Sequence, residues 1–236
     1  MGPDAKYIKK ITGFRTRCVK SCASTFDEIG NYDAIIARSQ KRGAGRGEHT
    51  FHSPLGGLYI VMRLSSLAID AHTLTPAVGL AVHDTIKNVL GVDTRLKWVN
   101  DVMADGKKVC GILCRSPRRG EYLIGIGINY ATTQFALENA GLDNAATLNA
   151  PEEKVNAFCA ELLRRIHLYA LAKFDHARYN ALCDTVGKDI SFVKDGVTVR
   201  GFAENVETDG TLIVRIGMAT VAVDSGEVSI IREEAK

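Results

Sequence analysis

The segment from Lys97 to Leu113 is the part of this 236-residue chain with the densest group of potentially reactive side chains. It contains an amide, a carboxylate, two lysines and a glycine: Asn100, Asp101, Lys107, Lys108 and Gly111. A glycine inside an apolar strand lets a ligand or another backbone approach closely. A buried lysine beside such a gap indicates an anionic ligand, because the ammonium group is a compact positive charge.

A β-hairpin is expected to position these residues. Asp105-Gly106 is typical of a two-residue hairpin turn, which predicts strands over 98–103 and 109–114. Alternation along the second strand sends Lys107 and Lys108 to opposite faces, so at most one of them can point into a site.

Residues 38–54 make a second cation-rich segment. Three glycines and four cations precede Phe51, and the cations are Arg38, Lys41, Arg42 and Arg46. We expect a loop that presents backbone N–H groups and guanidinium groups to an anion. It lacks the Gly-Lys-Ser/Thr of a P-loop. A mobile surface loop without a ligand is the alternative.

Two hydroxyls at Ser24 and Thr25 follow a predicted strand. Thr25 and Glu28 have the spacing of a helix-capping box. The alternative is that both hydroxyls bind a polar ligand group.

The remaining pattern predicts an α+β fold with a mixed, mostly antiparallel sheet and flanking helices over residues 1–186. We expect strands within 7–20, 34–37, 58–62 and 121–129, and helices from Thr75-Pro76 to Gly91 and from Pro151 onward. Short strands with turns at Asp195-Gly196, Asp209-Gly210 and Ser225-Gly226 predict a small all-β domain over 187–236.

Composition narrows the class of protein. The chain is 46% hydrophobic and 24% charged, as in ordinary globular proteins, and has neither a long apolar run nor a secretory signal pattern. We therefore expect a cytoplasmic protein with no membrane partner and six reduced cysteines, although the basic first twenty residues leave weak organelle targeting open. A net charge of +3 is too small to indicate a nucleic-acid partner.

Several of these segments together resemble the biotin–protein ligase family. Lys97-Trp98-Val99-Asn100-Asp101 is similar to its Lys-Trp-Pro-Asn-Asp signature, and Lys107-Lys108 with Gly111-Ile112-Leu113 follows at the family spacing. Similar matches are Ser24-Thr25, the loop from Gln40 to Pro54, Gly125–Asn129, and Gly226-Glu227-Val228-Ser229. The resemblance implies a class II synthetase-like catalytic domain followed by an SH3-like β-barrel.

The resemblance implies a two-step reaction. Biotin and ATP form biotinyl-5′-AMP and pyrophosphate, and a lysine of a carboxylase's biotin-accepting domain then takes the biotin. The catalytic residues implied are Lys108, Arg46 and Asp101. The implied biotin-binding residues are Ser24, Thr25, Phe26, Gln40, Gly43, Ala44, Gly45, Arg46, Lys108 and Gly111. The implied ATP-binding residues are Arg46, His49, Phe51, Lys97, Asn100, Asp101 and Asn129, with Asp101 as the candidate Mg²⁺ ligand.

The sequence departs from the family pattern in the cationic loop. Ala44 and His49 stand at arginine positions and Phe51 at a tryptophan position, so Ala44 keeps the backbone role of the loop but removes a cation. Val99 replaces a proline. Only 23 residues precede Ser24, too few for the DNA-binding domain of the family's repressors, so we expect no DNA binding.

Two other functions fit the same residues. One is a lipoate or octanoate ligase of the same superfamily, and the other is a non-catalytic biotin-binding protein. The sequence leaves open the acceptor proteins and whether the protein is a monomer or a homodimer.

Overall fold

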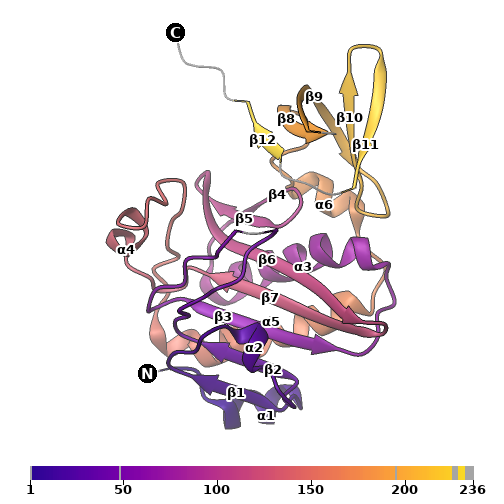
Figure 1. The fold of residues 1–236 in the computed structure, drawn as a ribbon. Helices are drawn as coiled ribbons and strands as arrows, with labels where there is room; N and C mark the ends of the chain where they lie inside the picture. Colours follow the sequence, from indigo (N-terminus) through magenta and orange to yellow (C-terminus); the bar gives the residue numbers. More distant parts are fainter. Residues whose placement is uncertain (1, 48, 195, 225–227, 232–236) are drawn as a thin grey trace.

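A computed structural model of the chain describes residues 2–47, 49–194, 196–224 and 228–231 (Figure 1). Its main element is a seven-stranded sheet with the order β1-β2-β3-β7-β6-β5-β4. Only β1 and β2 are parallel, and the other neighbours pair antiparallel. The strands are β1 Thr16–Val19, β2 Ala34–Ala37, β3 Leu58–Leu64, β4 Arg95–Lys97, β5 Asp101–Ala104, β6 Lys107–Arg118 and β7 Glu121–Ile128.

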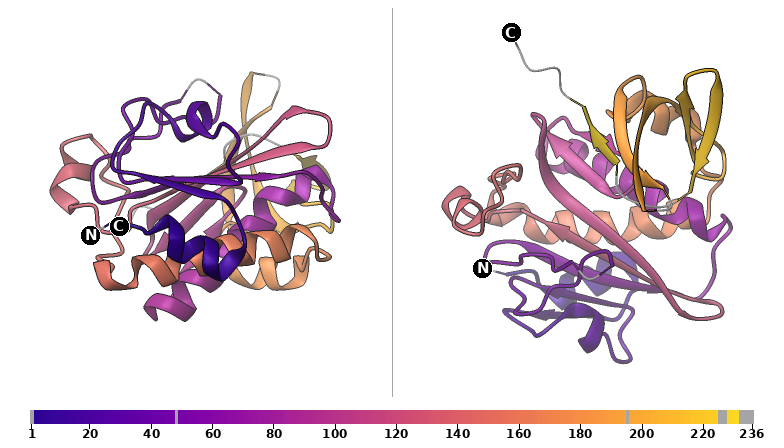
Figure 2. Two further views of the ribbon diagram at one scale, coloured as in Figure 1. Left: turned by 90° about the horizontal axis from the view of Figure 1, so that it is seen from below. Right: turned by 45° about the horizontal axis from the view of Figure 1, so that its top comes forward.

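Helices cover one face of this sheet. Figure 2 shows α1, α3 and α5 on one side, and the short helix α2 with the loop 38–54 on the other. The helices are α1 Ala5–Thr12, α2 Thr25–Glu28, α3 Ala71–Thr85 with a π-helical end Ile86–Leu90 (η1), α4 Gln134–Glu138, a 3-10 turn Glu152–Lys154 (η2), α5 Val155–Ala170 and α6 His176–Leu182. In the part of the chain that is described, no helix is long and apolar enough to cross a membrane.

The central strands are apolar on both faces because both faces are covered. In β2, Ile36 lies in the core beneath the helices, whereas Ile35 packs with Val61 on the opposite face. In β3, Ile60 and Met62 face the helices. This two-sided burial explains the nearly continuous apolar runs in the sequence.

The C-terminal residues form a separate five-stranded sheet with the order β11-β10-β9-β8-β12. Its strands are β8 Asp189–Lys194, β9 Val197–Val206, β10 Leu212–Ile216, β11 Ala219–Val223 and β12 Val228–Ile230. Trp98 joins the two sheets, because its indole N–H donates to the carbonyl of Gly210 at 3.0 Å. The α+β prediction with a small C-terminal β domain is confirmed, while the boundary between 186 and 187 stays a prediction.

The central hairpin is confirmed, but its strands are β5 and β6 and not residues 98–103 and 109–114. Asp105 and Gly106 both have positive φ, at 48° and 73°, as the type I′ turn requires. The predicted strand over 98–103 is wrong in its first half, because residues 98–100 form a turn between β4 and β5. The predicted turns at Asp195 and Ser225-Gly226 lie outside the described residues.

Three other predictions of local structure are wrong. The strand expected within 7–20 is present only as β1, and its first part is wrong, because residues 5–12 form α1, which Asp4 caps and in which Ile8 is buried. The helix predicted from Thr75 begins at Ala71 and carries Pro76 inside it. Ser24, not Thr25, is the N-cap of α2, and its hydroxyl makes no capping bond.

A buried ionic cluster joins α3, α5 and α6. Asp84 on α3 accepts hydrogen bonds from Arg178 and Tyr169 and lies 3.4 Å from Nη1 of Arg165. Burial alone would raise the pKa of Asp84, but the hydrogen bonds from Arg178 and Tyr169 outweigh burial and hold that pKa below its usual range. The cluster therefore stabilises the helical layer while Asp84 is ionised.

Replacing Asp84 with asparagine should lower the free energy of unfolding by about 2 kcal/mol at pH 7, because Arg178 loses its buried partner. A lowered carboxyl pKa gives stability that is complete above its unfolded value, about 3.9, and disappears as the pH falls through the folded value. The difference from wild type should therefore shrink below about pH 4. Urea unfolding of both proteins at several pH values measures this difference in the free energy of unfolding.

Asp93→Asn is the matched control, because the Asp93–Lys87 pair is solvent-exposed. We expect its unfolding curve to overlay that of the wild type. A D84N difference that is constant with pH would contradict this role of the Asp84 cluster.

Candidate active site

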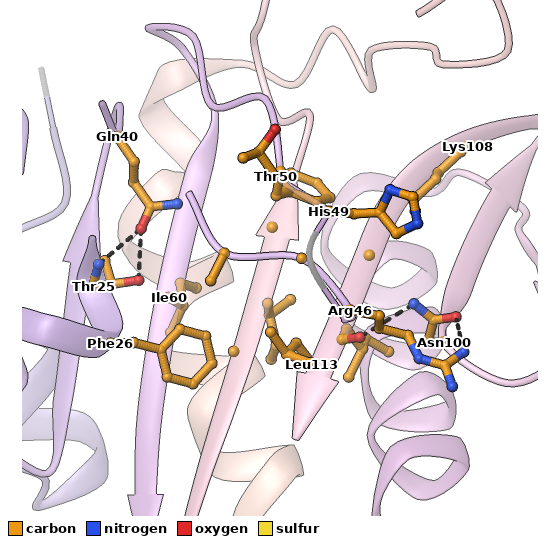
Figure 3. A pocket seen from close by; sticks show the side chains of 18 residues that line it. Thr25, Phe26, Gln40, Arg46, His49, Thr50, Ile60, Asn100, Lys108 and Leu113 are labelled. Carbon is orange, nitrogen blue, oxygen red and sulfur yellow. Dashed lines mark hydrogen bonds between the residues drawn. The ribbon is translucent and has the colours of Figure 1, made fainter. Parts of the chain in front are cut away.

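A cavity lies between the loop 38–54 and the sheet face opposite the helices (Figure 3). Residues from α2, the loop, β3, β6, β7 and the turn before β5 enclose it. They are Thr25, Phe26, Gln40, Ala44, Gly45, Arg46, His49, Thr50, Phe51, Ile60, Asn100, Lys108, Gly111, Ile112, Leu113, Gly125, Ile126 and Gly127.

Three glycines form the floor of this cavity. Gly111 on β6 pairs with Gly127 on β7, and Gly125 lies two residues before Gly127, so we call these three residues the glycine strip. A Cβ atom on Gly127 would lie 2.4 Å from Cε1 of Phe51, and one on Gly125 would lie 2.4 Å from Cζ of Phe26. Aromatic rings therefore rest directly on the backbone, where a side chain would displace them.

Cationic groups gather at one end of the cavity. Lys108 Nζ lies 2.7 Å from Oδ1 of Asp101 and 5.7 Å from the centroid of the Phe51 ring. Arg46 Nη1 donates to Oδ1 of Asn100 at 3.5 Å. Figure 3 shows Arg46, Asn100, His49 and Lys108 at the end away from Phe26. This end can neutralise negative charge on a ligand.

Backbone bonds hold the cationic end in place. Ile112 N–H donates to the carbonyl of Asn100 at 2.8 Å, which fixes the turn before β5 against β6. Lys108 N–H donates to the carbonyl of Asn144 at 2.8 Å, and Lys108 accepts from Ala146 N–H at 2.9 Å. Two backbone bonds to the segment 144–146 thus hold Lys108, and its side chain stays one-third exposed.

Hydroxyl and amide groups gather at the other end. The backbone N–H and the hydroxyl of Thr25 both donate to Oε1 of Gln40, each at 2.8 Å. The hydroxyl of Ser24 is buried and has no hydrogen-bond partner among the described residues. A buried unsatisfied hydroxyl is costly, so this group is available to a polar ligand.

Two buried groups near the cavity stay neutral at physiological pH. Burial raises the pKa of Tyr59, so its hydroxyl keeps its proton and donates to the carbonyl of Pro54 at 2.9 Å. Burial also raises the pKa of the Cys110 thiol. Neither group adds negative charge where the cations gather.

The structure brings eleven of the predicted site residues to this cavity. They are Thr25, Phe26, Gln40, Ala44, Gly45, Arg46, His49, Phe51, Asn100, Lys108 and Gly111. Asp101 lies behind this group through its ion pair with Lys108, and Lys97 lines a neighbouring hollow with Asp101 and Ser229.

Ser24, Gly43 and Asn129 are outside the described lining of the cavity. The Asn129 amide is buried and donates to the carbonyl of Ala146 at 2.9 Å, so Asn129 supports the loop that holds Lys108. No three His, Cys, Asp or Glu side chains gather as a resident metal site in the described ranges of the chain.

The sequence-based site missed part of the floor. Gly125 and Gly127 were placed on a strand that resembles the family's glycine-bearing strand, but not in the site. The sequence pattern that could have identified them is the alternation of two glycines within an apolar strand, because it leaves one face of the strand without side chains. The other missed lining residues are Thr50, Ile60, Ile112, Leu113 and Ile126.

Comparison with known proteins agrees with this geometry. Residues 16–129 match the family described as the biotin/lipoate A/B protein ligase family. The chain is 28% identical over 219 residues to the biotin–acetyl-CoA-carboxylase ligase of Mycobacterium tuberculosis, covering 85% of this chain and 80% of that protein. The enzyme of the same name from Paracoccus denitrificans is 27% identical over 213 residues, covering 82% and 88%.

The fold is also that of a solved relative. The structure of the biotin protein ligase from Aquifex aeolicus, in complex with biotin and ATP, has a TM-score of 0.79 at 22% identity and covers 92% of this chain and 99% of that one. The chain is therefore similar to the biotin/lipoate A/B protein ligase family over residues 16–129, similar in sequence over most of its length to proteins named as biotin ligases, and has the fold of a solved biotin protein ligase.

Proposed function

We propose that this protein is an ATP-dependent biotin–protein ligase. The observation that carries the proposal is a cavity with a hydroxyl and amide end, a side-chain-free floor and a cationic end. Biotin has the same polarity, with a ureido ring at one end and a carboxylate at the other. The relatives from M. tuberculosis and P. denitrificans are named as ligases of this kind.

In the first step, a carboxylate oxygen of biotin attacks the α-phosphorus of ATP, and the bond to the β-phosphate breaks, which releases pyrophosphate. Two anions must come together, so fixed cations should provide most of the rate acceleration. We assign Lys108 to the carboxylate and the developing acyl-phosphate, and Arg46 to the phosphate. Ser24, Thr25 and Gln40 would hold the ureido ring.

We propose that the nucleotide lies toward Arg46, His49, Phe51, Lys97, Asn100 and Asp101. Phe51 now rests on the glycine strip, so its ring must lift before a flat ligand can lie there. The loop 38–54 carries this ring, and we expect ligand binding to move the loop. Asn129 would support Lys108 through the loop at Ala146 instead of touching ATP.

Asp101 provides one carboxylate beside the proposed nucleotide position. Mg²⁺ bound with a nucleotide takes one or two protein carboxylates and the phosphates, so this residue fits an Mg²⁺ that arrives with ATP. When bound, the ion would neutralise phosphate charge. The ion pair between Asp101 and Lys108 also holds the lysine toward the cavity.

In the second step, a lysine amine of the partner attacks the acyl carbon of biotinyl-5′-AMP, an amide forms, and AMP leaves. We propose that this partner is the biotin-accepting domain of a carboxylase. We assign Asp101 to orient the incoming amine once Lys108 is engaged by phosphate.

Isotope exchange between pyrophosphate and ATP tests the first step without an acceptor. Purified protein with Mg²⁺ and biotin should exchange label, because adenylate formation is reversible. Lipoate and octanoate in separate reactions should give none. Exchange with those acids alone would assign the protein to the lipoate branch of its family, and no exchange with any acid would identify a binding protein.

Lys108→Ala should lower kcat for biotin-dependent exchange by a factor of about 100 to 1,000, because a fixed cation is removed from the transition state. The KM for ATP should change much less. Lys107→Ala is the matched control, since Lys107 is the exposed neighbour on the same strand. Equal rates in the two variants would remove Lys108 from the mechanism.

A further inference from the structure

A hydrogen-bonded chain outside the cavity ends at the ligand-binding amide. Gln40 Nε2 donates to the Ser53 hydroxyl oxygen at 3.0 Å, and Ser53 Oγ donates to the carbonyl of Phe51 at 2.8 Å. On its other side, Gln40 Oε1 accepts the two bonds from Thr25. Ser53 is therefore the residue that anchors the nitrogen end of the Gln40 amide.

The direction of every bond in this chain is determined by chemistry. The backbone N–H of Thr25 can only donate, so the oxygen of the Gln40 amide must face it. The Gln40 nitrogen then faces Ser53, whose oxygen accepts while its proton goes to the Phe51 carbonyl. An amide turned by 180° would place two donors at Thr25 and an acceptor at Ser53.

Ser53 has little freedom to move. Its side chain is buried, with the residue 5% exposed, and a Cβ on Gly43 would lie 2.4 Å from its Oγ. The backbone of Gln40 also donates to the carbonyl of Ser53 at 3.0 Å. Because Ser53 is outside the described lining of the cavity, it can influence a ligand only through its neighbours.

The fixed amide sets which polar groups the cavity offers. The Thr25 proton is used by Gln40, so the free lone pairs of the Thr25 hydroxyl can accept from a ligand N–H. The second proton on Gln40 Nε2, which is not used by Ser53, can donate to a ligand carbonyl. A group with both N–H and C=O, such as a cyclic urea, satisfies this pattern, whereas an alkyl chain or a dithiolane ring leaves it unsatisfied.

We propose that Ser53 is a positioning residue that makes this cavity selective for an acid bearing a cyclic urea, by fixing the orientation of the Gln40 amide. This inference rests on the proposed function, since biotin is such an acid. Without the Ser53 hydroxyl, the Gln40 nitrogen loses its buried acceptor, and the amide is held only at its oxygen by the two bonds from Thr25.

Steady-state exchange assays on Ser53→Ala test the proposal. Loss of one buried partner should raise the KM for biotin by about tenfold with little change in kcat. The KM for ATP should stay as in wild type, because the cationic end is untouched. Ser39→Ala, which removes a hydroxyl bonded to the carbonyl of Lys20 on the exposed part of the same segment, is the control and should behave as wild type.

A double-mutant cycle with Gln40→Met separates positioning from general stability. If Ser53 acts through Gln40, removing its hydroxyl in the Gln40→Met background should leave the KM for biotin unchanged. An equal effect in both backgrounds would overturn the proposal, and so would a parallel rise in the KM values for biotin and ATP. If Ser53→Ala does not fold, Ser53→Cys replaces the strong acceptor with a weak one and gives the same comparison.

Failure of this inference is distinguishable from failure of the proposed function. Wild-type protein that lacks biotin-dependent exchange would overturn both. Wild-type exchange with biotin, together with an unchanged KM in Ser53→Ala, would overturn the role of Ser53 alone.

Discussion

The contact between aromatic rings and bare backbone on the glycine strip is the constraint on which the site depends. Gly111, Gly125 and Gly127 leave one face of β6 and β7 without side chains, and Phe26 and Phe51 lie directly on it. A flat ligand can approach a sheet this closely only where Cβ atoms are missing. The strip also runs from the polar end of the cavity to Lys108, so a ligand on it can reach both ends.

The rest of the fold holds the glycine strip in place and keeps the polar and cationic groups at its two ends. The helices bury the opposite face of the sheet, so β6 and β7 are fixed from below by apolar packing. The Asp105-Gly106 turn determines which lysine faces the cavity, and the loop near Asn144 holds Lys108 by two backbone bonds. At the other end, Ser53 holds Gln40. Two separate segments thus place a charge and an amide at opposite ends of one floor.

Much of this arrangement could be predicted from the sequence where one local signal dominates. The Asp105-Gly106 turn fixed the hairpin and hence the opposite faces of Lys107 and Lys108, and the apolar runs identified the central strands. The helix at 5–12 was missed because it is only two turns long and buries a single residue, Ile8, so its apolar pattern is short. Asn129 was placed at the ligand because its strand points there, yet its amide bonds to a loop that is distant in sequence. The bonds of Ser53 likewise depend on tertiary contacts that no spacing predicts.

The most direct test of the glycine strip is calorimetric titration of biotin into wild-type protein and into Gly127→Val. We expect biotin to bind at least about tenfold more weakly to the variant, because the added side chain occupies the floor of the cavity. Circular dichroism and thermal melting should show a folded protein in both samples. Equal affinity for biotin in a folded Gly127→Val protein would show that the ligand does not lie on the glycine strip.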